Sequence, residues 1–382
     1  MATPQTQRAS GLWPGLQEKF TEQLHVRLES IVVLVGLAVI MSILSPFFLS
    51  VSNFMNILLA TSTIGILAIA ATFVLSSGGL DLSIGSVLGL SGVVGASVAV
   101  NLGMPTPIAV FATIGAGALA GLVNGWVITR GFVPAFIVTL GMLGIARGLA
   151  LVISDGRVIY GLPDWMLFLG QGRPFGIPMP VIILIVVAII MHIVLACTRF
   201  GRHTLAIGDN ENAALTAGIN VDLHRLTLYT LSGGLAGLAG LLFATRINSG
   251  DPTAGISYEL TAITAAIIGG TNLFGGRGSI LGTIVGALIM GGLMTARHYL
   301  IWWPFHPLGF AVSTGWVMNS LWFSIFLAWL IKVLALKYGG PRTYALTRPF
   351  FIGIVLGQFV AAGLWLVIDG FTGMVGNSIP VY

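Results

Sequence analysis

The stretch that decides the fold reads Gly78-Gly79-Leu80-Asp81-Leu82-Ser83-Ile84-Gly85-Ser86, and it lies between two long apolar runs. Two adjacent glycines permit a helix to end. A carboxylate within a bilayer is costly unless it faces a polar cavity or a partner. A non-helical backbone at membrane depth is tolerated only where protein or water covers it. The stretch therefore predicts a broken membrane helix beside a path for something polar.

The composition around this stretch is that of a membrane protein. Of the 382 residues, 56% are hydrophobic and only 8% are charged, whereas soluble domains carry about 25% charged residues. The single cysteine, Cys197, excludes an internal disulfide and a cysteine cluster. The six histidines are scattered, so no metal site is predicted. Seventeen Lys and Arg residues spread over many loops indicate membrane topology rather than nucleic-acid binding.

Hydropathy predicts an all-α fold, a polytopic transmembrane helical bundle of about 10–11 spans with broken or re-entrant helices. A spanning helix needs about 20 apolar residues. The glycine-rich stretches 78–86 and 269–279 are the predicted re-entrant turns. The candidate spans lie near residues 30–49, 55–77, 84–101, 106–129, 134–153, 179–197, 226–246, 258–275, 279–298, 309–334 and 350–369.

Basic residues predict the orientation of the chain. Eleven spans put the N-terminus inside and the C-terminus outside, and twelve of the seventeen Lys and Arg residues then fall on the inside. This bias agrees with the positive-inside rule. The first apolar run is too long for a cleavable signal and lacks its cleavage site. Residues 1–29 are therefore predicted to form a cytoplasmic N-terminal tail.

Polar residues near the helix ends are candidates for a translocation path. Asp81 or Ser83 can cap the helix after the break, and the hydroxyl groups of Ser83 and Ser86 suit a hydroxyl-rich cargo. The alternative is that Asp81 caps its own helix and never meets the cargo. Asn124 lies near the end of a span, where helix packing is its other role. Glu259 opens a span, as a helix cap or as part of an outer vestibule.

A second polar segment, residues 198–225, contains Gly208-Asp209-Asn210-Glu211-Asn212-Ala213-Ala214-Leu215-Thr216-Ala217-Gly218. Asp209 or Asn210 can cap a short helix that runs through Ala217 and ends at Gly218. This helix is too short and too polar to span a membrane. It is either a knob that docks a partner protein or an ordinary solvated loop.

Several motifs are missing from the sequence. A Walker A motif needs Gly-Lys followed by Ser or Thr, and none of the three lysines follows a glycine. No zinc-protease motif and no nucleophile elbow occur, so no catalytic residue is predicted and the chain is not expected to be an enzyme. Asp81 is the one buried titratable group in a candidate path. An ion-coupled secondary transporter of a small polar solute is therefore the weaker alternative to an ATP-driven one.

The motifs resemble those of the inner-membrane permeases of bacterial ABC sugar importers, of the ribose, xylose and galactose type. The resemblance covers residues 50 to about 295 in family order. The matching stretches are Asn53 to Leu59, Gly65 to Ile69, Gly78 to Ser86, Gly121 to Gly125, Pro134 to Gly141, Phe200 to Ile219 and Tyr258 to Gly282.

The resemblance implies a monosaccharide importer of the bacterial inner membrane, embedded in lipid and without nucleic acid. It implies a second permease, in a homodimer or heterodimer, and a periplasmic sugar-binding protein outside. An ABC ATPase that binds ATP and magnesium would dock inside, so this chain itself is expected to bind no cofactor. The family's coupling pattern, Glu-Ala-Ala-x-x-x-Gly, is degraded here. The expected coupling loop consists of Asn210, Glu211, Ala213, Ala214 and Gly218, with Glu211 facing a basic partner residue.

Beyond residue 298 the chain departs from this pattern. We therefore predict a permease transmembrane domain over residues 30–298 and an atypical C-terminal transmembrane segment over residues 299–382. The latter weakly resembles a group of uncharacterised bacterial membrane proteins.

Overall fold

The computed structural model describes residues 48–299 without a break, and scattered residues between 32 and 43, between 323 and 340, and at 349 and 353. The predicted tail, residues 1–29, lies outside the described residues, as does most of the predicted segment 299–382. The chain forms two compact units, residues 1–311 and 312–382. In the second unit the described residues of 323–340 are helical.

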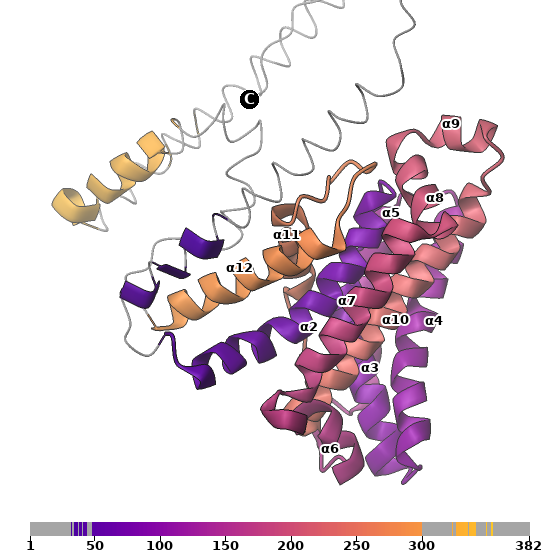
Figure 1. Ribbon diagram of the computed structural model, residues 1–382, viewed down its shortest axis with the longest axis horizontal. Helices are drawn as coiled ribbons and strands as arrows, with labels where there is room; N and C mark the ends of the chain where they lie inside the picture. Colours follow the sequence, from indigo (N-terminus) through magenta and orange to yellow (C-terminus); the bar gives the residue numbers. More distant parts are fainter. Residues whose placement is uncertain are drawn as a thin grey trace, which may run out of the picture. The chain divides into compact units, whose positions relative to one another are not determined.

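The first unit is built from helices joined by short links (Figure 1). Its longer helices are α2 (Val51–Ser76), α3 (Ile84–Ala96), α4 (Thr106–Arg130), α5 (Ala135–Ile153), α7 (Met179–Cys197), α10 (Val221–Ile247) and α12 (Ile280–Tyr299). The short ones are the π-helix η1 (Ser97–Asn101), which continues α3, then α6 (Asp164–Gln171), the 3₁₀-helix η2 (Pro174–Gly176), α8 (Arg199–Asp209), α9 (Glu211–Thr216) and α11 (Tyr258–Ile268). Two short antiparallel strands, β1 (Ile159–Tyr160) and β2 (Ser249–Gly250), pair Ile159 with Gly250.

The predicted polytopic helical bundle is confirmed. Among the described residues, six helices are long and apolar enough to cross a membrane, namely α2, α3 with η1, α4, α5, α7 and α10. The side chains of α12 are described only as far as Met294, and the predicted spans 30–49, 309–334 and 350–369 fall largely outside the described part of the chain.

The predicted span 258–275 is wrong. Its helix, α11, has only 11 residues and ends before Gly269, which corresponds to about 16 Å at 1.5 Å per residue. A hydrocarbon core is about 30 Å thick. The helix ends because the backbone turns at Gly270, which has a φ of 88°. Hydropathy does not register this turn, because the flanking residues are apolar, whereas the glycine-rich stretch 269–279 predicted a turn here.

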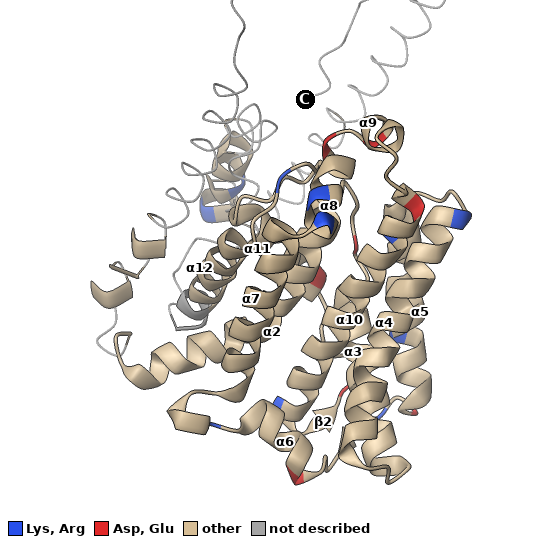
Figure 2. Ribbon diagram, turned by 45° about the vertical axis from the view of Figure 1, so that its right-hand side comes forward, with Lys and Arg blue, Asp and Glu red and all other residues tan. Residues whose placement is uncertain are grey.

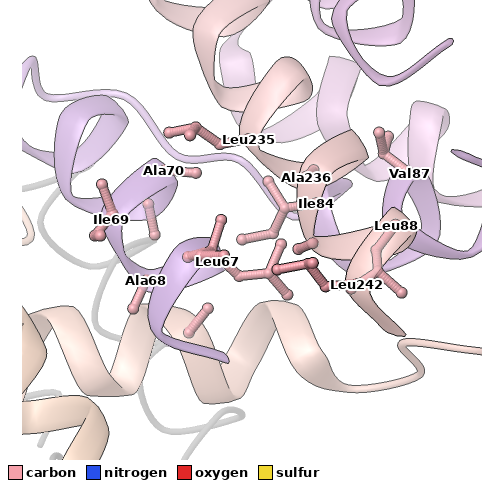
Figure 3. Close-up of a cluster of buried hydrophobic side chains, with 14 of the residues drawn as sticks. Leu67, Ala68, Ile69, Ala70, Ile84, Val87, Leu88, Leu235, Ala236 and Leu242 are labelled. Atoms are coloured by element: carbon pink, nitrogen blue, oxygen red, sulfur yellow. The ribbon is translucent and has the colours of Figure 1, made fainter. Parts of the chain in front are cut away.

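Helix α10 lies at the centre of the bundle and packs against α4, α3 and α2. The apolar part of α2 is 83% buried, whereas the corresponding parts of α5 and α7 are 22% buried. Helices α2, α3 and α10 thus form the interior, and α5 and α7 present apolar side chains outward. Figure 3 shows Leu67, Ile84 and Leu242 from these three inner helices meeting in one buried cluster.

Glycines bring α4 and α10 into backbone contact. A Cβ atom added at Gly233 of α10 would overlap the carbonyl oxygen of Gly117 and lie 2.8 Å from the nitrogen of Gly121, both in α4. Lipid removes the hydrophobic drive between helices, so close packing of small residues has to supply the attraction. The small-residue contact explains why α4 remains attached to α10 although much of its surface faces outward.

Figure 2 shows most charged residues at the two ends of the bundle. Helices α8 and α9 lie at one end, and α6 and β2 lie at the other (Figure 2). We name these the α8–α9 end and the β1–β2 end.

Candidate functional site

The link between α2 and α3, residues 77–83, is the broken helix that the sequence predicts. The chain leaves α2 at Gly78, where φ is 78°. A residue other than glycine rarely adopts this backbone conformation. The helix end is closed by backbone bonds from the nitrogens of Gly78 and Gly79 to the carbonyl oxygens of Leu75 and Val74. These two bonds close the end of α2, and in the link that follows Asp81 and Ser83 are buried whereas Gly78 is exposed.

Asp81 is the centre of a buried hydrogen-bond network. Its side chain is 3% exposed. Oδ1 accepts hydrogen bonds from the backbone nitrogen of Ser83 at 2.9 Å and from the Ser83 hydroxyl at 2.6 Å. Oδ2 accepts one from the hydroxyl of Ser232 in α10, at 2.9 Å. The carboxylate thus binds the start of α3 to α10 and does more than cap its own helix.

Asn124 joins this network from α4. Its side-chain nitrogen donates to the Ser83 hydroxyl at 2.9 Å, and the residue is fully buried. Its oxygen Oδ1 has no hydrogen-bond partner within the described part of the chain. Asn124 therefore has a role beyond helix packing, because it completes a polar contact among three helices.

The structure brings together three of the five path candidates, namely Asp81, Ser83 and Asn124. Ser86 lies one turn further along α3, and its hydroxyl donates to the Ser83 carbonyl oxygen at 2.9 Å. Glu259 is apart from the network, in the first turn of α11, with its carboxylate against Gly85. Sequence reasoning missed Ser232. Its signal is a serine placed directly before Gly233-Gly234 in an apolar span.

A cavity of about 350 Å³ opens beside the link. Tyr229 of α10 lines it and donates from its hydroxyl to the Leu80 carbonyl oxygen at 3.4 Å. The cavity thus lies next to the Asp81 network and near the α8–α9 end. Its lining residues are Ser77, Gly78, Gly79, Ile128, Phe132, Val133, Pro134, Ala135, Arg225 and Tyr229.

The polar segment 198–225 forms α8 and α9, as predicted for its short helix. Asn210 caps α9 by accepting a hydrogen bond from the nitrogen of Ala213 at 3.0 Å. The chain turns at Gly218, where φ is 82°, and α9 ends at Thr216, one residue before the predicted end. Ala213 is exposed, whereas Ala214 is buried at 3% exposure.

The buried side of α9 packs on its own chain. Ala214 contacts a small apolar cluster with Ile207 of α8, Val221 of α10 and Ile219. Its methyl group is therefore not free to enter a partner's groove. The exposed face of α9 presents Glu211, Asn212, Ala213, Leu215 and Thr216.

Glu211 already has a basic partner within the chain. Arg225 of α10 donates to both carboxylate oxygens, at 2.8 and 2.6 Å. The side chain of Glu211 remains 45% exposed and that of Arg225 remains 28% exposed. A bidentate pair fixes geometry, so Glu211 holds α9 over the start of α10.

Glycines at the α8–α9 end bring three segments together. A Cβ atom added at Gly208 of α8 would overlap the carbonyl oxygen of Ser76 and lie 2.5 Å from the nitrogen of Gly276. The nitrogen of Gly276 also donates to the carbonyl oxygen of Ser76 at 3.0 Å. We call Gly78, Gly208 and Gly275 with Gly276 the glycine junction. It joins α8 to the 77–83 link and to the link between α11 and α12.

We expect Gly208→Ala to separate these segments. The added methyl group has backbone atoms as neighbours, so one segment has to shift, at a cost of about 1–3 kcal/mol. Hydrogen exchange measured by mass spectrometry should then increase in residues 77–83 and 269–279. Gly144→Ala is the matched control, because a Cβ atom at Gly144 meets nothing within 4 Å. Equal exchange in both variants would contradict the contact.

The described residues hold no group of three His, Cys, Asp or Glu side chains that could bind a metal ion. The side-chain polar groups of the Asp81 network are hydroxyls, an amide and one carboxylate, and Arg225 lines the adjacent cavity. They offer hydrogen bonds to a neutral polar molecule or to one another.

Comparisons with known proteins show the family of this chain. Residues 53–334 match the family described as the permease component of branched-chain amino acid transport systems. The chain is 41% identical to the ribose import permease protein of Escherichia coli K12 over 299 residues, which is 77% of this chain and 91% of that protein. It is 42% identical to the ribose import permease protein of Bacillus subtilis over 290 residues, 73% of this chain and 89% of that protein. It is 34% identical to the xylose transport system permease protein of Haemophilus influenzae, and the match covers 70% of this chain and 89% of that protein. No solved structure matches the chain.

Proposed function

Because this chain belongs to the permease-component family of branched-chain amino acid transport systems, we propose that it is the membrane subunit of an ATP-driven importer whose cargo is a monosaccharide. The observation that carries the cargo class is the similarity to sugar permeases. The ribose import permease, the D-allose permease and the xylose permease are 41%, 38% and 34% identical to this chain. These relatives favour ATP-driven import over ion-coupled transport.

The proposed subunit does not hydrolyse ATP. No lysine follows a glycine in the sequence, so the chain has no Walker A lysine. A separate ATPase is the proposed source of energy, and a secreted sugar-binding protein is the proposed source of cargo. A second permease completes the proposed assembly.

The ATPase is proposed to dock at the α8–α9 end, which would be cytoplasmic. Arg199 and Arg202 of α8 support this orientation, because basic residues concentrate on the cytoplasmic side of membrane proteins. Helix α9 offers an exposed surface there, and its position is fixed by the bond between Glu211 and Arg225. Movement of α8 and α9 would reach the 77–83 link through the glycine junction.

The Asp81 network and the adjacent cavity are proposed to lie along the cargo path. Ser77 and Tyr229 are among the residues that line the cavity, and hydroxyl groups can both donate to and accept from a sugar. Transporters often place such sites at discontinuous helices. Alternating access would then expose this cavity to one side of the membrane at a time.

Reconstitution tests the proposal. The chain is purified with an ABC ATPase and a sugar-binding protein from the same organism and placed in proteoliposomes that contain ATP. We expect concentrative uptake of a radiolabelled monosaccharide from a panel of ribose, xylose, allose and arabinose, and none of leucine. The chain alone should accumulate nothing. Concentrative uptake by the lone chain would refute the assignment, and uptake of leucine instead of sugar would refute the cargo class.

Glu211→Arg should abolish uptake without unfolding the bundle. An exposed ion pair contributes at most about 1 kcal/mol to stability, so the melting temperature of the purified chain should change little. The double variant Glu211→Arg, Arg225→Glu restores the pair in reverse. If Glu211 also contacts the ATPase, the double variant stays inactive, and ATPase co-purification is reduced in both. Normal uptake by Glu211→Arg would contradict docking at α9.

A further inference from the structure

The chain between α10 and α11 enters the bundle as a non-helical segment. We call residues 249–257 the inserted segment. Along it, the neighbouring positions on α3 run from Ala96 near Gly250, through Gly89 near Ala254, to Gly85 near Gly255. Eleven residues of helix correspond to about 16 Å. The segment therefore runs antiparallel to α3 from the β1–β2 end, and α11 begins deep inside the bundle.

Glycines of α3 make room for this segment. Gly85, Gly89 and Gly92 lie on one helix face, and a Cβ atom at Gly89 would lie 2.8 Å from the Ala254 carbonyl oxygen. At Gly85 it would lie 2.5 Å from the carbonyl oxygen of Gly255. The backbone of the segment is thus in direct contact with α3, and its polar groups need partners that an apolar environment does not provide.

Arg147 supplies two of those partners. It lies in the membrane-spanning helix α5, where an arginine is costly unless it is paired. Its Nη1 atom donates to the carbonyl oxygens of Pro252 and Ala254, at 2.5 and 2.7 Å. Glu259 and Asp251 are the acidic side chains that act on it electrostatically. One guanidinium group therefore fixes the middle of the inserted segment.

The two ends of the segment are left-handed backbone turns. Asn248 and Ser257 both have positive φ, 55° and 65°. A left-handed asparagine is a common helix C-cap, whereas a serine keeps this conformation only where its surroundings impose it. The side chain of Asn248 accepts a hydrogen bond from the nitrogen of Leu162 at 3.0 Å, and β1 pairs with β2. Between these anchored ends, Arg147 donates to two of the segment's carbonyl oxygens.

We propose that Arg147 is a positioning residue that latches the inserted segment against α3, and that the segment is released and re-latched during transport. Release would open the bundle from the β1–β2 end. The latch itself follows from the contacts above, whereas its opening during transport rests on the proposed function.

Thiol labelling tests the latch without requiring transport. Ala254 is 8% exposed, so in the full chain with Cys197→Ser the variant Ala254→Cys should react slowly with a membrane-impermeant maleimide. Adding Arg147→Gln should increase the labelling rate roughly tenfold to a hundredfold, because bonds from a charged donor no longer hold the segment. Arg157→Gln, at an exposed position in the loop after α5, should leave the rate unchanged. An unchanged rate with Arg147→Gln would overturn the latch.

A second labelled site separates local release from unfolding. Ala236 is fully buried in α10, so Ala236→Cys should stay protected when Arg147→Gln is present. If Ala236→Cys reacts with the maleimide, the experiment is repeated with Arg147→Lys in place of Arg147→Gln. Lysine keeps the charge but lacks the guanidinium fork, and we expect Ala254→Cys to label faster while Ala236→Cys stays protected. Equal protection of Ala254→Cys with lysine and arginine would also overturn the latch.

Opening during transport is tested in the reconstituted importer with Arg147 intact. Labelling of Ala254→Cys should accelerate when ATP, binding protein and a transported monosaccharide are present together. Sugar uptake that proceeds while Ala254→Cys remains as protected as at rest would overturn the opening step. Absence of uptake in the unsubstituted importer would instead contradict the proposed function, and the maleimide result on the resting chain would still decide the latch.

Discussion

Replacing Asp81 with leucine should reduce the free energy of unfolding on the order of 3 kcal/mol or more, because each buried polar group left unpaired costs about 1–3 kcal/mol. The substitution removes the acceptors of the Ser83 nitrogen, the Ser83 hydroxyl and the Ser232 hydroxyl. The melting temperature of the purified chain in detergent measures the effect. Asp222→Leu is the control, because Asp222 is exposed in the first turn of α10. Equal melting temperatures for the two variants would contradict the central place of the network.

The companion variant Asp81→Asn separates hydrogen bonding from charge. An asparagine keeps one acceptor for Ser83 and offers an amide to Ser232, whose hydroxyl can accept as well as donate. We expect this variant to fold and, in the reconstituted importer, to transport within roughly threefold of the unsubstituted chain, which is less than about 1 kcal/mol. Loss of uptake in a well-folded Asp81→Asn protein would mean that the negative charge itself belongs to the cargo path.

The other large effect is expected at the contact between α4 and α10. A Cβ atom at Gly121 would overlap the carbonyl oxygen of Tyr229 and lie 3.1 Å from the Cα atom of Gly233. Gly121→Leu therefore has to push the helices apart, which costs more than the 1–3 kcal/mol of ordinary overpacking because the neighbours are backbone atoms. We expect little folded protein by size-exclusion chromatography. Gly115→Leu, on an open face of α4 where a Cβ atom meets nothing within 4 Å, should elute like the unsubstituted chain.

A milder variant connects this packing to the polar site. Gly121→Ala should shift α4 slightly, and Asn124, less than one turn away, should then lose its 2.9 Å bond to Ser83. Because both substitutions break the same contact, the losses in melting temperature from Gly121→Ala and Asn124→Ala should not add. Additive losses would indicate that helix packing and the network are independent.

The local features of this protein could be predicted from its sequence. Runs of apolar residues identify the six long helices, because the lipid-exposed length of a span depends on hydropathy alone. The helix break at Gly78, the Asn210 cap and the turn at Gly218 follow from the chemistry of single residues and their neighbours. The family resemblance, supported by the motifs from Gly78 to Ser86 and from Tyr258 to Gly282, also predicted the family that the comparisons show.

The long-range pairings could not be predicted. Asp81 bonds to Ser232, 151 residues away, and Arg147 bonds to carbonyl oxygens 105 and 107 residues away. Glu211 has the required charge for a partner protein, but its nearest basic group is Arg225 of the same chain. Hydropathy also does not identify the inserted segment, because an extended segment among helices and a loop outside the membrane have similar compositions.

By itself, then, the sequence determined which six segments form long apolar helices, where most of them stop and which family the chain belongs to. These properties depend on each residue and its neighbours in the chain, so they can be predicted from the local sequence. Only the tertiary structure decided that Asp81 ties α3 to α10, that Gly208 touches two links, and that Arg147 holds a backbone segment at depth. Those contacts depend on how helices pack through glycine faces, and the packing is settled jointly by the whole bundle.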